Sequence, residues 1–180
     1  MRLENLIADI DEEMFTKIVE NRSVRDKDAR DTAKIVGLAA IKYGDLSNQA
    51  TKDYIFDVDR FTSFEGNTGP YILYTIVRIK SILNRYVEAG GNLEAGEILP
   101  ASNGSEKNLM LQLSGFGSMI ESAFEEKAPH KICAYIYEVS NAFNSFYHET
   151  KILSEENQAQ KESYIRLLQL TKRVLETSID

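Results

Sequence analysis

The stretch SFEGNTGPYILYTIVRIKSILNRY, Ser63 to Tyr86, decides the expected fold, because a polar turn leads directly into a strongly helical pattern. The turn residues of interest are Gly66, Asn67, Gly69 and Pro70. Glycine permits backbone angles that other residues resist, and proline suits the first turn of a helix, where its missing N–H is no loss. The side chain of Asn67 or Thr68 is expected to cap the exposed amides. The turn therefore predicts a helix that begins close to Pro70.

An amphipathic helix follows this turn. Its apolar side chains step by three and four residues and so share one face: Ile72, Ile76, Ile79, Leu83 and Tyr86. Gly90 and Gly91 are expected to end the helix, and the Gly, Ser, Asn and Pro content from there to Glu106 predicts a loop.

Three more helices with apolar faces are expected after the loop. Their inward residues are Leu109, Leu113, Phe116, Ile120 and Phe124 in the first, Ile132, Ile136, Val139, Phe143 and Phe146 in the second, and Tyr164, Leu167, Leu168, Thr171 and Leu175 in the third. Pro129 is expected to start the second of them. Four such faces must be buried against each other, so the sequence predicts an all-α fold built on a helical bundle.

The residues before the turn are expected to form connecting helices ahead of the bundle. Apolar residues recur at helical spacing in two segments, Leu6, Ile10, Met14, Ile18 and Val19, then Ala33, Val36, Gly37, Ala40 and Ile41. Gly37 costs roughly 1 kcal/mol against alanine inside a helix unless close packing offsets it. Residues 53–61 alternate in polarity, and we expect them to be irregular, with a short helical turn.

Composition excludes several classes of protein. The 180 residues include one cysteine and two histidines, with a formal net charge of −7. A lone cysteine forms no internal disulfide, and the histidines lack nearby cysteine partners, so no metal site is expected. No apolar run approaches the ~18 residues of a membrane span. The acidic balance argues against a general DNA binder, and together these features predict a cytoplasmic protein.

Two polar stripes on the predicted helices are the candidate binding residues. One carries Tyr74, Arg78, Ser81 and Arg85, and the other carries Tyr137, Asn141, Asn144 and His148, with Tyr147 beside them. Exposed rings beside amides and guanidinium groups suit single-stranded RNA, since bases stack on rings and arginine meets phosphate. The segment from Gly66 to Val87 also contains no acidic residue. The alternative is an ordinary solvated face, of the kind found on a helical protein–protein interaction module.

No catalytic site is predicted in this chain. Glu121, Glu125 and Glu126 could be drawn as an acid–base group, but nothing apolar or metal-like organises them. The glycines of SGFGS, Ser114 to Ser118, follow no strand and so do not form a nucleotide loop.

Several long motifs resemble arginyl-tRNA synthetase, a class I aminoacyl-tRNA synthetase. They are VGLAAIKYGDLSN (Val36–Asn48), DYIFDVDRF (Asp53–Phe61), SFEGNTGPY (Ser63–Tyr71) and YTIVRIKSIL (Tyr74–Leu83). The region around Pro129-His130 and the Phe143-Asn144-x-Phe146-Tyr147 signature resembles the DALR-type anticodon-binding domain.

This resemblance implies a C-terminal fragment of an arginine–tRNA ligase. It implies that residues 1–65 connect to a catalytic domain and that residues 66–180 form the anticodon-binding bundle. The family's full enzyme, expected to be a monomer, joins arginine to its tRNA with ATP and Mg, and its nucleotide motifs are not in this sequence. Tyr147 is then the candidate for stacking on an anticodon base. The turn would set the angle between the anticodon reader and the active site, and its helix N-terminus could hold a phosphate.

Overall fold

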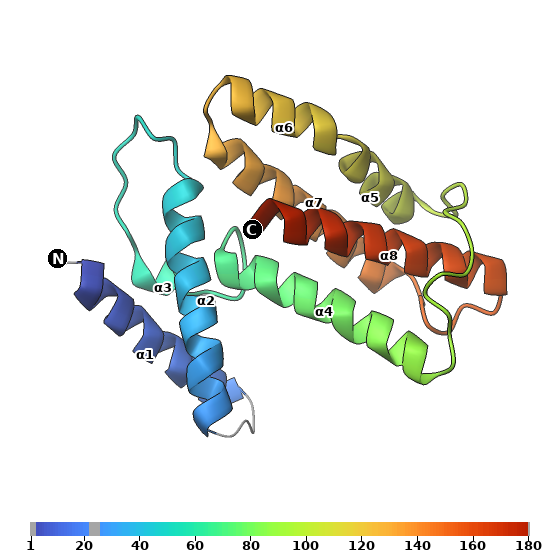
Figure 1. Ribbon diagram of the computed structural model, residues 1–180, viewed down its shortest axis with the longest axis horizontal. Coiled ribbons are helices and arrows are strands. Elements are labelled where there is room, and N and C mark those ends of the chain that lie inside the picture. The colour runs from blue at the N-terminus through green and yellow to red at the C-terminus, as the bar shows by residue number, and fades with distance from the viewer. Residues whose placement is uncertain (1–2, 22–25, 180) are drawn as a thin grey trace. The chain divides into compact units, whose positions relative to one another are not determined.

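The computed structural model describes residues 3–21 and 26–179, and within them every regular element is a helix (Figure 1). The all-α prediction is confirmed. The chain forms two compact units, Met1–Tyr74 and Thr75–Asp180. The division falls inside α4 (Gly69–Glu88), further along the chain than the boundary predicted after residue 65.

The first unit is built on α1 (Leu3–Asn21) and α2 (Asp26–Leu46), which pack against each other. Its buried core residues are Ile10, Met14, Ile18, Ala29, Ala33 and Val36. A Cβ on Gly37 would lie 2.7 Å from Asp11 Oδ1 on α1, so the helices approach closely at this glycine, as its place in the stripe suggested. In the same repeat, Ile18 is buried and the adjacent Val19 is 39% exposed.

A one-turn helix, α3 (Val58–Phe61), confirms the short helical turn predicted in residues 53–61. Asp57 caps it, since its carboxylate accepts a hydrogen bond from the Arg60 amide at 3.1 Å. Phe61 is buried, and its ring contacts the Phe56 ring at a centroid distance of 4.5 Å.

The turn before α4 caps the helix as expected, with Thr68 as the capping residue. Thr68 caps the helix by accepting a hydrogen bond from the Tyr71 amide at 3.2 Å, whereas the Asn67 carbonyl accepts one from the Tyr43 hydroxyl. Gly66 has the left-handed φ of 77° that favours glycine. Gly69 is glycine for another reason, because a Cβ there would lie 2.3 Å from the Ala39 carbonyl oxygen of α2. Pro70 stands in the first turn of α4, as predicted.

The second unit contains the rest of α4 with α5 (Gly104–Ser114), α6 (Phe116–Glu125), α7 (Pro129–Glu149) and α8 (Gln158–Ile179). α7 packs against α5, α6 and α8, which lie around it in Figure 1. The largest fully buried side chains of the second unit are Ile79, Leu109, Ile136, Phe143, Phe146, Ile165, Leu167, Leu168 and Leu175. This core confirms the inward faces predicted for α4, α7 and α8.

One predicted helix is in fact two. The apolar pattern from Leu109 to Phe124 was expected to be continuous, but the chain breaks at Gly115 between α5 and α6. The break rotates the following residues, so Ala123 is buried while Phe124 is 82% exposed. The inward assignment of Ile120 and Phe124 was therefore wrong.

The loop between α4 and α5 is fixed at both of its ends. α4 stops in a Schellman turn, with Gly90 at a φ of 86° and the Gly91 amide donating to the Tyr86 carbonyl at 2.9 Å. Further on, the Leu99 amide donates to Ser163 Oγ on α8 at 2.9 Å, and the hydroxyls of Ser102 and Tyr164 lie 2.9 Å apart. These contacts hold the loop along α8.

Candidate nucleic-acid interface

The second unit brings three of the predicted site residues together: Arg78 of α4, and Asn144 and Tyr147 of α7. α7 carries its buried residues on one side, including Phe143 and Phe146, which positions the polar stripe beside them. The guanidinium of Arg78 donates a hydrogen bond to the Asn144 side-chain carbonyl. Residues that lie far apart in the sequence therefore form one polar group on adjacent helices.

Tyr147 is the aromatic centre of this group, and its side chain is 36% exposed. The Arg78 guanidinium carbon lies over its ring at 5.1 Å from the centroid, within the range of a cation–π contact. The Phe143 ring lies 6.1 Å away at an interplanar angle of 25°, and the His148 ring lies 5.5 Å away at 62°. Tyr147 is thus supported by its neighbours while part of its surface remains open to solvent.

Asn144 is half-buried, and both ends of its amide are engaged with α4. Its carbonyl oxygen accepts from Arg78, and its Nδ2 donates to Thr75 Oγ1 at 3.4 Å. Thr75 is fully buried. Sequence reasoning missed Thr75, although a threonine on the apolar side of a predicted helix was a usable sign of a buried polar contact.

The other predicted residues are less closely grouped. Tyr137 and Asn141 lie on the same stripe of α7 as Asn144 and are half-buried. Arg85 is exposed near the end of α4, two turns beyond Arg78. Tyr74 is 38% exposed and belongs to the first unit. The structure therefore brings together a group around Tyr147, and it does not add Arg85 to that group.

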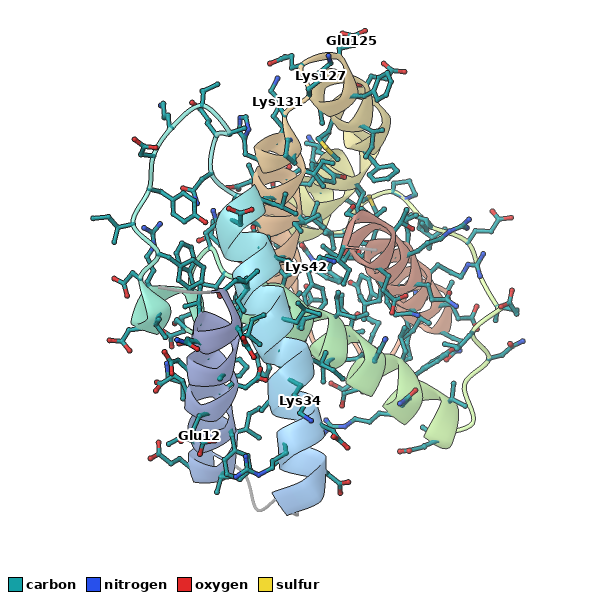
Figure 2. The ribbon with its side chains drawn as sticks, turned by 60° about the vertical axis from the view of Figure 1, so that its left-hand side comes forward. Glu12, Lys34, Lys42, Glu125, Lys127 and Lys131 are labelled. Atoms are coloured by element: carbon teal, nitrogen blue, oxygen red, sulfur yellow. The ribbon has the colours of Figure 1, made fainter. Side chains whose placement is uncertain are left out.

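Some of the other cations on the second unit are paired with carboxylates. Lys80 Nζ lies 2.8 Å from Glu176 Oε1 on α8. Lys131 forms an ion pair with Glu126 where α6 meets α7, close to Lys127 (Figure 2). A hydrogen bond from Lys131 and its charge hold the pKa of Glu126 below the ordinary value. These lysines are less available for phosphate than the arginines of α4.

Two amides at the start of α4 are engaged within the turn and the helix itself. The Tyr71 amide donates to Thr68 Oγ1, and the Ile72 amide donates to the Thr68 carbonyl at 3.2 Å. Pro70 has no amide hydrogen. The turn of Gly66, Asn67, Gly69 and Pro70 therefore has a structural role in the first unit, and its phosphate contact stays a prediction.

The described residues offer neither a metal-binding cluster nor a membrane-spanning helix. Residues 3–21 and 26–179 contain no cluster of three or more His, Cys, Asp or Glu side chains suited to a metal ion. Over the same residues, no helix has both the length and the apolar character needed to cross a bilayer.

Comparison with known proteins agrees with this architecture. Residues 72–180 match the model of the DALR anticodon binding domain. The chain belongs to the DALR anticodon-binding domain family. The match begins within α4, close to the point where the second compact unit starts, so the DALR domain and that unit largely coincide.

Curated relatives of this chain are arginine–tRNA ligases. An arginine–tRNA ligase of Agathobacter rectalis is 64% identical over 188 residues, which cover 100% of this chain and 32% of the relative. One from Alkaliphilus oremlandii is 51% identical and is covered to 30%. The chain thus spans about a third of the length of these curated relatives, and the resemblance to arginyl-tRNA synthetase is confirmed.

Solved structures give the same fold. The arginyl-tRNA synthetase of Thermus thermophilus aligns with a TM-score of 0.89, covering 100% of this chain and 31% of that one. At 24% identity, this likeness shows the fold alone. The arginyl-tRNA synthetase of Plasmodium falciparum aligns with a TM-score of 0.86 at 26% identity.

Proposed function

We propose that this DALR domain binds the anticodon stem-loop of an arginine-accepting tRNA on the surface that α4 and α7 form around Tyr147. The observation that carries the proposal is the partly exposed Tyr147 ring, which Arg78 supports. Asn141 and Tyr137 lie on the polar stripe of the same helix. Unpaired bases stack on such rings, and amides and guanidinium groups contact base edges and phosphates. Arg85 extends the proposed surface along α4, and Tyr74, in the first unit, stays a predicted tRNA contact.

A second part of the proposal concerns a longer protein that contains this chain. Aminoacylation of tRNA with arginine, using ATP and Mg, is assigned to the part of the relatives that this chain does not span. We expect that protein to be cytoplasmic and monomeric. Pyrophosphate exchange catalysed by the 180-residue chain alone would contradict this assignment of the chemistry.

Replacing Tyr147 tests the proposed surface directly. We expect Tyr147→Ala to weaken binding of an arginine tRNA by about 1–3 kcal/mol, because a base loses its stacking partner. Fluorescence titration of the labelled tRNA measures the affinity, and circular dichroism checks the fold. Unchanged affinity in a folded variant would remove Tyr147 from the site. Leu111→Ala, an exposed apolar truncation on α5, is the matched control and should leave affinity unchanged.

A second candidate is a helical protein–protein interaction module without RNA binding. The exposed Phe124 and Ile120 on α6 favour it, since apolar side chains on one helix face suit a protein partner. A gel shift with an arginine tRNA and a non-cognate tRNA separates the two functions. Retarded migration of the arginine tRNA alone supports the first, and no shift with either supports the second.

A further inference from the structure

The geometry points to Asn144 as a positioning residue, which holds Arg78 against the Tyr147 ring and does not itself read a base. This inference rests on the proposed function and refines it. The polar stripe of α7 led to the expectation that Asn144 contacts tRNA directly, as an amide that reads a base edge. Its hydrogen bonds in the structure instead indicate that it positions Arg78.

The hydrogen-bonding groups of the Asn144 amide are directed at α4. An asparagine side chain recognises a base edge by presenting its carbonyl and its NH₂ together. In Asn144, the carbonyl accepts from the Arg78 guanidinium and the NH₂ donates to Thr75 Oγ1. Both groups are turned toward α4. Each group keeps a second hydrogen-bonding position, but pairing with a base edge would have to turn the amide away from α4, against its hydrogen bond to a charged guanidinium.

The hydrogen bond to Asn144 restricts the orientation of Arg78. A guanidinium is planar and has its donors in a fixed fork, so one hydrogen bond restricts the orientation of the whole group. Here that group lies over the Tyr147 ring at 5.1 Å from the centroid. Asn144 therefore fixes the arginine on one side of the tyrosine, and the tyrosine is ordered before RNA arrives.

The restricted side chains affect how strongly RNA binds. Restricting a side chain before binding removes part of the entropy cost of ordering it in the complex. The loss of Asn144 should then weaken the binding of every loop sequence alike, because the ring and the guanidinium are less ordered. The loss of a base-reading amide would instead weaken binding of the cognate base only.

Nuclear magnetic resonance of the chain without RNA tests the positioning itself. We expect the Arg78 Nε–H resonance to show a ring-current shift from Tyr147, which Tyr147→Leu abolishes. Asn144→Ala should remove most of that shift although the ring is still present. Asn144→Asp, which keeps the acceptor for Arg78, should retain it. An Arg78 signal that is the same in Asn144→Ala as in the unmodified chain would overturn the inference.

Titration with a labelled anticodon stem-loop and its single-nucleotide variants tests the consequence. We expect Asn144→Ala to weaken all of these RNAs by the same factor, roughly tenfold. The Arg78→Ala/Asn144→Ala double variant should bind no more weakly than Arg78→Ala, within a factor of about two, because Asn144 acts through Arg78. Asn108→Ala on the exposed side of α5 serves as the matched control and should bind like the unmodified chain.

The outcomes separate this inference from the function it refines. Discrimination lost at a single loop nucleotide in Asn144→Ala would identify a base-reading amide and refute the positioning role, while tRNA binding would stand. No binding by the unmodified chain would refute the proposed function, and the resonance of Arg78 would still decide whether Asn144 positions it.

Discussion

At Gly69 the backbone of α4 lies directly against the backbone of α2. A Cβ at this position would lie 2.3 Å from the carbonyl oxygen of Ala39 and 2.6 Å from its carbonyl carbon. These are main-chain atoms, which cannot rotate away as a side chain can. The contact therefore requires glycine even though the backbone angles at Gly69 do not.

We expect Gly69→Ala to lower the free energy of unfolding by about 2 kcal/mol or more, because the added methyl group forces α2 and α4 apart. Urea denaturation followed by circular dichroism measures the change. Gly117→Ala is the matched control: its Cβ would meet nothing within 4 Å in α6. That variant should gain up to about 1 kcal/mol from helix propensity. A neutral Gly69→Ala would show that the helices tolerate the methyl group.

The two glycines of this turn show a limit of reading one sequence. The pattern predicted a turn and a helix start, and both are present. Gly66 needs its positive φ, whereas Gly69 needs the absence of a side chain beside another helix. Glycine satisfies both requirements, so the sequence alone does not distinguish them. The position of α2 shows which requirement applies at Gly69.

At the level of helices, prediction worked where one apolar face runs through a single element. Buried residues such as Ile79 on α4 and Phe143 on α7 lie where their spacing placed them. Prediction failed from Leu109 to Phe124, because the spacing continues across Gly115 and a break of one residue leaves that pattern intact. The grouping of Arg78, Asn144 and Tyr147 could be suspected from two separate stripes, but the contact with buried Thr75 depends on how α4 and α7 pack.

An ion pair joins α8 to α4. Glu176 on α8 lies 2.8 Å from Lys80 Nζ on α4 and 3.1 Å from Lys172 Nζ on its own helix. The hydrogen bond from Lys80 and the two positive charges lower the pKa of Glu176 below its ordinary value, against the opposing effect of burial. A carboxyl group with a lowered pKa in the folded state stabilises that state only while it is ionised.

We expect Glu176→Gln to lower the free energy of unfolding by about 0.5–1 kcal/mol at pH 7, the range of partly exposed ion pairs. The contribution is fully present above the unfolded-state pKa of about 4.3 and is lost as the pH falls through the lower folded-state pKa. The difference between the two proteins should therefore shrink between pH 5 and about pH 3 in urea denaturation. Glu138→Gln, at an exposed position on α7, is the control. A difference that stays constant with pH would exclude the ionic origin.

At the level of the whole molecule, two units have separate cores and the division lies within one continuous helix. Met14 belongs to the core of the first unit, and Leu168 belongs to that of the second. Cys133, the single cysteine of the chain, lies in the second unit on α7. Its thiol is a natural reporter of opening in that unit.

We expect a thiol reagent at pH 8 to label Cys133 at least about 100-fold more slowly in the native chain than in urea. Burial raises the pKa of this thiol to about 11, so little of the reactive thiolate forms until the unit opens. Leu168→Ala, which removes core contacts worth about 2–5 kcal/mol, should accelerate native labelling. Met14→Ala removes a comparable side chain from the other core and should leave the labelling rate within about threefold of the unmodified chain, because Cys133 belongs to the second unit. Equal acceleration by the two variants would mean that α4 couples both cores into one cooperative transition.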